Sequence, residues 1–384
     1  MTPINSSNIV DSEVKLKSKK WTDGLIFVIV MWLLSRLVII VAMQLIAPLL
    51  HTLLVKQGYP LPSVPVPSFV PKTGWELFSH WDGPLYGNIA TLGYDYANDG
   101  QPHTVAYFPL FPLLCRGLMI LGLPFEVAGV LVNNLALLGA LLVLYRWAQE
   151  RHGISAAKWA TAVLAWCPFS LFGTVIYTEG LYLLITTAAL RAFDKRQHAW
   201  AALWGAMATA TRAPGVALVP AFLLVAWAER RSAIAYAAGL ATGVGLLLFS
   251  VYCAIRFGEP LAFVHVNKAW PQPNGLNLFM DLLFLDPPSV IRVVILFGGG
   301  YLLWRLRFKL PSVAVAYGFC SLALLLSVRA LNSFNRYAYG IVSLSLALGV
   351  LLACHPRWGY GTMVLFAMLL VSFSIRFAWW YWVG

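Results

Sequence analysis

The feature that most constrains this chain is a series of long apolar runs separated by short polar segments. A helix needs roughly 20 apolar residues to cross a bilayer. The first run, residues 24–49, meets that length and is too long for the core of a cleavable signal peptide. Only 11% of the 384 residues are charged, against roughly 25% in soluble proteins. We therefore predict an all-α, polytopic transmembrane helical bundle, and exclude a soluble or disordered chain.

The apolar runs predict roughly 10–11 spans. The stretch 199–228 fits either one long helix or two short ones, and Pro214 with Gly215 favours a break there. The predicted spans are 24–49, 127–145, 157–173, 176–191, 199–211, 215–228, 233–255, 290–304, 312–328, 337–353 and 359–378.

Basic residues indicate which loops share a side of the membrane. With the basic tail 1–23 in the cytoplasm and a break at Pro214, every second loop is cytoplasmic. Those loops carry most of the Lys and Arg residues, as the positive-inside rule requires. The same pattern accounts for the net charge of +12 without a nucleic-acid partner. We expect one integral-membrane domain over residues 1–384.

Two long loops then fall on the outer side, 51–126 and 256–289. The first contains a semi-apolar piece, 106–123, which we interpret as short interfacial or re-entrant helices. A crossing there would reverse the pattern of basic loops. The aromatic run Trp379-Trp380-Tyr381-Trp382 is typical of an anchor at the membrane interface.

The predicted topology gathers acids and bases on the outer side, whereas the cytoplasmic loops hold mostly Lys and Arg. Such convergence points to a site on the outer face. Because the histidines lack the spacing of metal ligands, we expect no metal site and no cofactor, with a divalent metal as the alternative. The outer polar residues are Asp82, Asp95, Asp99, Glu179, Arg212, His265, Lys268, Arg329, Asn332, Asn335 and Arg336.

Several motifs carry a resemblance to a known family. The run from Trp81 to Tyr94, W-D-G-P-L-Y-G-N-I-A-T-L-G-Y, and the later F-P-L-F-P at 108–112 resemble the PIG-V family of GPI mannosyltransferase 2 and its bacterial relatives. That family consists of multi-spanning GT-C glycosyltransferases. Ser35-Arg36, the segment from Pro168 to Glu179, and the segment from Thr211 to Gly215 look like further elements of the family, in the expected order.

The resemblance implies an enzyme of the bacterial inner membrane with its site on the non-cytoplasmic face. It would move a sugar, with mannose expected, from a polyprenyl-phosphate donor to a lipid or glycan acceptor, with inversion. Inversion needs one base for the acceptor proton and cations for the lipid phosphate. Many GT-C relatives carry two acids close together in the first outer loop, whereas Asp82 stands alone here, so a metal-binding pair of acids is not expected.

We assign the catalytic base to Asp82; the alternative is a turn cap at Asp82-Gly83-Pro84. Glu179 and Arg36 have a structural ion pair as their alternative, because buried charges need partners. Tyr86 could instead shape the loop, and His265 and Lys268 could be ordinary loop residues. The residues assigned to substrate binding are Glu179, Arg212, Arg336, His265, Lys268, Tyr86 and Arg36.

A transporter or flippase for a polar or lipid-linked solute is the alternative function. Transporters commonly contain inverted repeats with broken helices in matching halves. The sequence shows no such repeat, and its polar residues concentrate in two outer loops. This asymmetry favours an enzyme that works at one membrane face.

Overall fold

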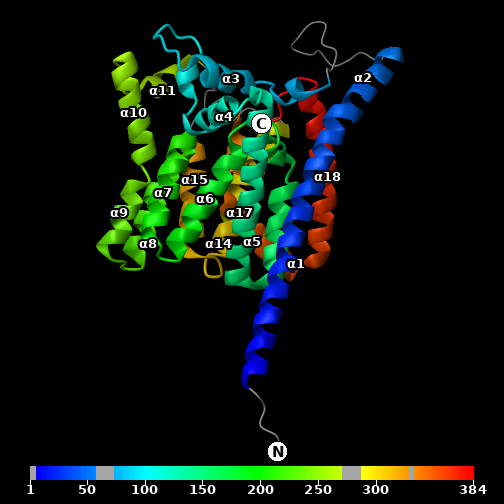
Figure 1. Ribbon diagram of the computed structural model, residues 1–384, viewed down its shortest axis with the longest axis vertical. Helices are drawn as coiled ribbons and strands as arrows, with labels where there is room; N and C mark the ends of the chain where they lie inside the picture. The colour runs from blue at the N-terminus through cyan, green and yellow to red at the C-terminus, as the bar shows by residue number, and fades with distance from the viewer. Residues whose placement is uncertain (1–5, 58–72, 270–286, 328–332) are drawn as a thin grey trace, which may run out of the picture.

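The computed structural model describes residues 6–57, 73–269, 287–327 and 333–384, and in these ranges every regular element is a helix. The helices stand side by side as a bundle (Figure 1). The chain enters at the lower end of this view with α1 (Ser6–Val41), and the short helices α3 (Gly83–Leu92) and α4 (Leu110–Ile120) lie at the upper end. The predicted all-α fold is confirmed.

Four helices in the described ranges are long and apolar enough to cross a membrane: Thr22–Lys56, Phe125–Trp166, Ala233–Phe257 and Pro356–Ala378. The first continues through a π-helical turn, η1 (Ala42–Ile46), into α2 (Ala47–Lys56). The loop predicted to begin at residue 51 therefore begins only after this helix. The further predicted spans correspond to shorter or interrupted helices.

The helix α5 (Phe125–Trp166) is a hairpin that reverses at Gly153. The φ of Gly153 is +84°, a conformation that glycine adopts readily. Tyr145 before the reversal and Lys158 after it both lie against Phe27 of α1, with 6.3 Å between the two ring centroids and 5.5 Å from the Lys158 nitrogen to the Phe27 ring. The two arms correspond to the separately predicted spans 127–145 and 157–173, although the second arm ends at Trp166 and not at residue 173.

The predicted break near Pro214 is present. The helix α7 (His198–Thr211) ends where Arg212 adopts an extended backbone, and η5 (Ala213–Ala217) leads into α8 (Leu218–Ala228). A Cβ at Gly215 would lie 2.7 Å from the backbone of Ala208, so the tight turn back against α7 requires glycine.

Other breaks were not predicted. The span 233–255 is divided into α9 (Ala233–Ala241) and α10 (Val244–Phe257), and the span 337–353 is divided between α16 (Phe334–Tyr339) and α17 (Val342–Cys354). The remaining elements are η2 (Trp75–Phe78), η3 (Thr104–Ala106), η4 (Pro168–Gly173), α6 (Glu179–Asp194), α11 (Ala262–His265), η6 (Val266–Ala269), α13 (Pro287–Val293), η7 (Val294–Gly298), α14 (Gly299–Arg305), α15 (Ser312–Ser327) and α18 (Pro356–Ala378).

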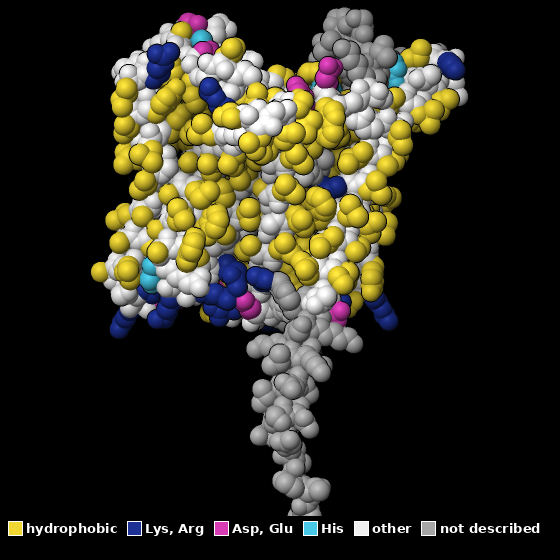
Figure 2. Space-filling view, in the orientation of Figure 1, with side chains coloured by type: hydrophobic (Ala, Val, Ile, Leu, Met, Phe, Trp, Pro, Cys, Tyr) yellow, Lys and Arg dark blue, Asp and Glu magenta, His cyan; other side chains and the backbone are white. Residues whose placement is uncertain are grey.

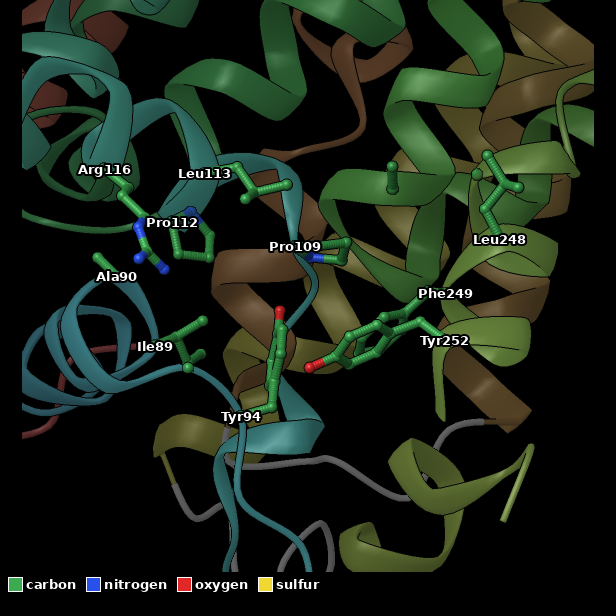
Figure 3. Close-up of a pocket in the computed structure, with 13 residues that line it drawn as sticks. Ile89, Ala90, Tyr94, Pro109, Pro112, Leu113, Arg116, Leu248, Phe249 and Tyr252 are labelled. Atoms are coloured by element: carbon green, nitrogen blue, oxygen red, sulfur yellow. The ribbon is translucent and has the colours of Figure 1, made fainter. Parts of the chain in front are cut away.

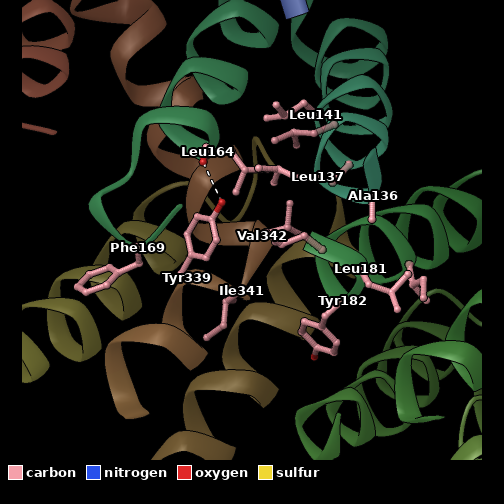
Figure 4. Close-up of a cluster of buried hydrophobic side chains, with 14 of the residues drawn as sticks. Ala136, Leu137, Leu141, Leu164, Phe169, Leu181, Tyr182, Tyr339, Ile341 and Val342 are labelled. Atoms are coloured by element: carbon pink, nitrogen blue, oxygen red, sulfur yellow. Dashed lines mark hydrogen bonds between the residues drawn. The ribbon is translucent and has the colours of Figure 1, made fainter. Parts of the chain in front are cut away.

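The core lies where α5, α6 and α17 meet (Figure 4). Leu137, Leu164 and Val342 are fully buried there. Tyr339 donates a hydrogen bond from its hydroxyl to the carbonyl of Leu164 at 3.1 Å. Because this bond ties α16 to the second arm of α5, it fixes the element that carries Arg336 against the core.

The surface divides into a broad hydrophobic band and two polar ends (Figure 2). Lys and Arg side chains gather at the lower end of the view. There Glu150 pairs with Arg191 and Lys195, and Asp194 with Arg151. The short helices of the first loop lie at the opposite end. The separation of basic loops from the polar upper end agrees with the predicted alternation, and the orientation in a membrane stays a prediction.

Candidate active site

Four predicted site residues meet at the upper end of the bundle. Arg336 pairs through Nη1 with Asp82 Oδ2 at 2.6 Å and through Nε with Glu179 Oε1 at 3.2 Å. Arg212 Nη1 lies 2.7 Å from the same Glu179 oxygen. The side chain of Glu179 is fully buried, both arginines are 8% exposed, and Asp82 is 19% exposed. We call these four residues the acid–arginine network.

Asp82 owes its position to the start of α3. Its carbonyl accepts the first helical hydrogen bonds, from the amides of Leu85 and Tyr86, while its side chain makes no capping bond. Trp81 before it has a φ of +60°, an uncommon conformation for a bulky residue. The carboxylate is therefore directed into the network, and the alternative in which it caps the turn does not match the structure.

The other three members lie at helix ends or breaks. Glu179 is the first residue of α6, where the helix dipole favours a negative charge. Arg212 occupies the extended residue between α7 and η5, and Arg336 lies on the short helix α16. Interrupted helices at this end bring charged side chains from three distant parts of the chain to one point.

Aromatic rings enclose the two arginines. The Arg336 guanidinium lies 4.9 Å from the Tyr177 ring and 5.5 Å from that of Trp382, and Arg212 lies 4.8 Å from Tyr337. Rings at these distances attract a cation. They also keep water away from the guanidinium groups, which strengthens the electrostatic interactions in the site.

The aromatic run at 379–382, which was predicted to be a membrane-interface anchor, also makes contacts beside the site. Trp380 stacks on His80 at 4.0 Å between ring centroids, and Trp382 meets the ring of Trp81 edge-on at 5.4 Å. Burial lowers the pKa of His80 to about 4, so its ring is neutral at neutral pH. The run therefore packs against the segment that leads into Asp82.

Two tyrosines hold Asp82 in place, and sequence reasoning missed both. The Tyr107 hydroxyl donates to Asp82 Oδ1 at 3.2 Å, and the Asp82 amide donates to the Tyr177 hydroxyl at 3.3 Å. With Arg336 on Oδ2, both carboxylate oxygens have a partner. Tyr107 directly precedes the F-P-L-F-P run, so the motif was a signal that could have identified it. Tyr86 is buried edge-on against Tyr107 at 5.1 Å and supports that ring.

Several buried polar atoms at this point lack a hydrogen-bond partner among the described residues. They include Glu179 Oε2 and Trp81 Nε1. The arginine contacts with Glu179 are close, yet they are not aligned as hydrogen bonds. Buried polar groups in folded proteins are normally satisfied by protein groups or by ordered water, so these atoms mark a strongly polar point inside the bundle.

Arg36 lies elsewhere in the bundle. Its guanidinium donates to the carbonyls of Ser170 and Ala165 at 2.7 and 3.0 Å and to the Thr174 hydroxyl at 2.6 Å. These contacts satisfy the charge by holding the turn η4 against α1. The placement favours a structural role over the predicted contact with substrate, and neutral oxygens take the place of the ion pair that was the alternative.

His265 and Lys268 belong to a separate region. His265 pairs with Glu259 at 3.0 Å, and Lys268 is exposed on η6. This region packs around Phe108, Phe249 and Phe263. Within the described ranges no contact joins either residue to the acid–arginine network. Arg329 and Asn332 fall outside the described residues.

His103 joins two other predicted polar residues in the first loop. Its ring nitrogens lie 2.7 Å from Asp95 Oδ2 and 2.9 Å from Asp99 Oδ1. These hydrogen bonds raise the pKa of His103. Burial alone would raise the pKa of Asp95, but hydrogen bonds from Thr104 and His103 outweigh it and lower that pKa. In the part of the chain that the structure describes, no group of three or more His, Cys, Asp or Glu residues is arranged so that it could hold a metal ion.

Comparison with solved structures identifies the fold. The bundle resembles ArnT from Cupriavidus metallidurans in the apo state, with a TM-score of 0.50 and 15% identity over 88% of this chain and 62% of that one. The same enzyme bound to undecaprenyl phosphate gives a TM-score of 0.48 and 16% identity over 73% of this chain and 56% of that one. The Archaeoglobus fulgidus oligosaccharyltransferase in complex with Zn and sulfate gives a TM-score of 0.49 and 16% identity, over 92% of this chain and 53% of that one. The fold is that of the GT-C membrane glycosyltransferases.

The sequence then identifies the family. Residues 22–260 match the mannosyltransferase (PIG-V) family, and because this is more than half of the chain, the protein belongs to that family. The matched range includes Asp82, Glu179 and Arg212. The chain spans less than two thirds of the length of the solved structures above. No curated protein sequence matches it significantly.

Proposed function

We propose that this multi-pass membrane mannosyltransferase moves a mannosyl group from a polyprenyl-phosphate lipid to an acceptor hydroxyl at the end of the bundle that carries α3. The observation that carries the proposal is the acid–arginine network. It places one partly exposed carboxylate beside two buried guanidinium groups, which is the inventory that an inverting transfer from a lipid phosphate requires.

The proposed reaction is a single displacement at the anomeric carbon. The acceptor hydroxyl loses its proton to the carboxylate of Asp82, and its oxygen forms a bond to C1 of the sugar. The bond from C1 to the phosphate oxygen breaks on the opposite face, and the electron pair leaves with the polyprenyl phosphate. Arg212 and Arg336 stabilise the charge that develops on the phosphate. Attack from the opposite face inverts the configuration.

The pairing of Arg336 with Asp82 suggests how donor binding prepares the base. A guanidinium at 2.6 Å from the carboxylate occupies Oδ2, the oxygen that would take the proton. We propose that the donor phosphate draws Arg336 away from Asp82, so that this oxygen can take the acceptor proton only when the donor is in place. Arg212 remains anchored on Glu179 and supplies the second positive charge.

The test is Asp82→Asn, assayed with radiolabelled polyprenyl-phosphate mannose in membranes. Asn keeps the shape of Asp but does not take up the acceptor proton. Transfer per folded molecule should fall at least about a hundredfold, because a general base contributes typically 10²–10⁴-fold. Glu76→Gln, at an exposed acid just before α3, is the matched control and should retain activity. Near-normal turnover in Asp82→Asn would refute the assignment of the base.

A further inference from the structure

The end of α18 and the residues that follow it lie against the turn that carries the proposed base. His80 stacks on Trp380 with 4.0 Å between ring centroids, and its Nδ1 lies 3.1 Å from the carbonyl oxygen of Phe377. The ring centroid of Trp81 lies 5.9 Å from that of Trp380 and 5.4 Å from that of Trp382. One short segment therefore holds both residues that precede the base.

The turn needs such support because its backbone conformation is unfavourable. The amide of Gly83 donates to the carbonyl of His80 at 3.2 Å, which closes a tight turn over Trp81 and Asp82. Trp81 occupies the first central position with a φ of +60°, where glycine is the usual residue. A bulky residue keeps such a conformation only where its surroundings enforce it. The two indoles that contact Trp81 are those surroundings.

One side of α3 gives the turn little help. Ile89 and Ala90 of α3 line a cavity of about 420 Å³ together with Pro112 and Leu113 of α4 (Figure 3). Side chains that border a cavity have no packing partner on that side. The position of the start of α3, and with it that of Asp82, thus depends more strongly on the contacts of the turn.

Trp382 contacts the surroundings of both the base and its arginine. Its ring meets that of Trp81 edge-on and lies 5.5 Å from the Arg336 guanidinium. Its ring centroid also lies 6.2 Å from that of Phe172, which is fully buried. Packing against the core thus fixes the Trp382 ring, and this ring in turn supports the turn before α3.

We infer that Trp382 is a positioning residue for Asp82. Its ring holds Trp81 in the unfavourable conformation, and this conformation directs the carboxylate into the acid–arginine network. The inference rests on the proposed function, in which Asp82 takes the acceptor proton. A base has to lie within hydrogen-bond reach of that proton, so a small displacement slows the reaction while the donor still binds.

The first test compares Trp382→Leu with Trp379→Leu. Trp379 belongs to the same aromatic run but contacts α2, where its Nε1 donates to the carbonyl of Ala47 at 3.0 Å. Trp382→Leu should lower kcat per folded molecule about tenfold or more and change KM for polyprenyl-phosphate mannose less than about twofold. Trp382→Phe keeps an aromatic edge and should recover part of the loss. Trp379→Leu should change neither constant.

An increase of KM in Trp382→Leu with an unchanged kcat would overturn the inference, because the ring would then act on donor binding. A second comparison asks whether Trp382 acts through the base. Trp382→Leu should cause no further loss of transfer when it is added to Asp82→Asn, because residues that act as a unit are strongly non-additive. A further loss of about tenfold in the double variant, as large as in the single one, would show an independent role and refute the inference.

Amide hydrogen exchange separates this inference from the proposed function, because it needs no transfer. The amides of Gly83 and Tyr86 donate to carbonyls of the turn. They should exchange faster in Trp382→Leu than in the unaltered protein, and at the unaltered rate in Trp379→Leu. Equal exchange in both variants overturns the inference, even where Asp82→Asn abolishes transfer. If exchange responds as expected but the unaltered protein transfers no mannose, the proposed function fails instead.

Discussion

Glu179 is the residue on which the site depends structurally. Its fully buried carboxylate lies between Arg212 and Arg336, and a buried charge is tolerated only beside opposite charges. Removing one partner from a buried ion pair costs about 3–5 kcal/mol, because the other charge is left uncompensated.

Glu179→Gln should therefore lower the thermal unfolding temperature in detergent and weaken donor binding together. Glu126→Gln is the control, since Glu126 also lies in the first turn of a helix of this bundle but stands outside the network. A variant with normal stability and weak donor binding would instead mean that Glu179 contacts the donor directly.

Tyr107 is predicted to position the base. Its hydroxyl donates to Asp82, and a hydrogen bond to a charged group contributes about 1.5–3 kcal/mol. Tyr107→Phe should therefore reduce kcat about tenfold or more and leave KM for the donor unchanged. Tyr86→Phe is the control, because the Tyr86 ring packs on Tyr107. Equal losses in both variants would show that packing of the two rings matters and the hydroxyl does not.

At the scale of elements, the segment between α3 and α4 is fastened by His103 to Asp95 and Asp99. Tyr94, in the same segment, donates to the carbonyl of Tyr107 at 2.8 Å. The pKa of His103 is higher in the folded protein than in the unfolded chain. Protonated His103 therefore stabilises the fold completely at pH values below its pKa in the unfolded chain. This stabilisation is lost as pH rises through its pKa in the folded protein. The lowered pKa values of Asp95 and Asp99 act oppositely, so their contribution is lost as pH falls through the folded values.

The segment should therefore be most ordered between the lowered carboxyl pKa values and the raised imidazole pKa. Hydrogen exchange of residues 93–109, normalised to the rate of an unstructured peptide, should increase above that window. In His103→Gln the exchange should be fast and independent of pH in the range where the imidazole titrates. A steep pH dependence that persists in His103→Gln would place the titrating group elsewhere.

The sequence predicts those features of the elements that neighbouring residues determine, and it does not predict those that depend on contacts between distant residues. The break at Arg212 follows from Pro214 and Gly215 in the chain itself. The pairing of Asp82 with Arg336 joins residues 254 positions apart, so no local pattern predicts it. The contact of Trp382 with Trp81 escaped prediction for the same reason, since aromatic residues at a helix end suit a membrane interface and a packed site equally well. His265 and Lys268 are on the same predicted side of the membrane as the network, but they lie in a separate region.

For the whole molecule, the two ends of the bundle should lie on opposite sides of the membrane. We predict that Lys56→Cys, in a background without other cysteines, reacts with an impermeant reagent added outside the cell. A variant that retains only Cys354, which is exposed at the start of the α17–α18 connection, should react only after the membrane is opened. The reverse pattern would invert the topology and put the acid–arginine network in the cytoplasm.

The wide separation of Asp82 and Arg336 in the sequence also affects when the site can form during protein synthesis. Ribosomes add roughly 5–20 residues each second, so 254 positions correspond to a delay of roughly ten to fifty seconds between the synthesis of the two residues. Glu179 and Arg212 are close in the sequence, so they can pair soon after synthesis, while the chain is still growing. Asp82 cannot pair with Arg336 until Arg336 has been synthesised. The growing chain thus carries an acid without its partner while these 254 residues are added, and the enzyme acquires its complete site only once α16 has been made.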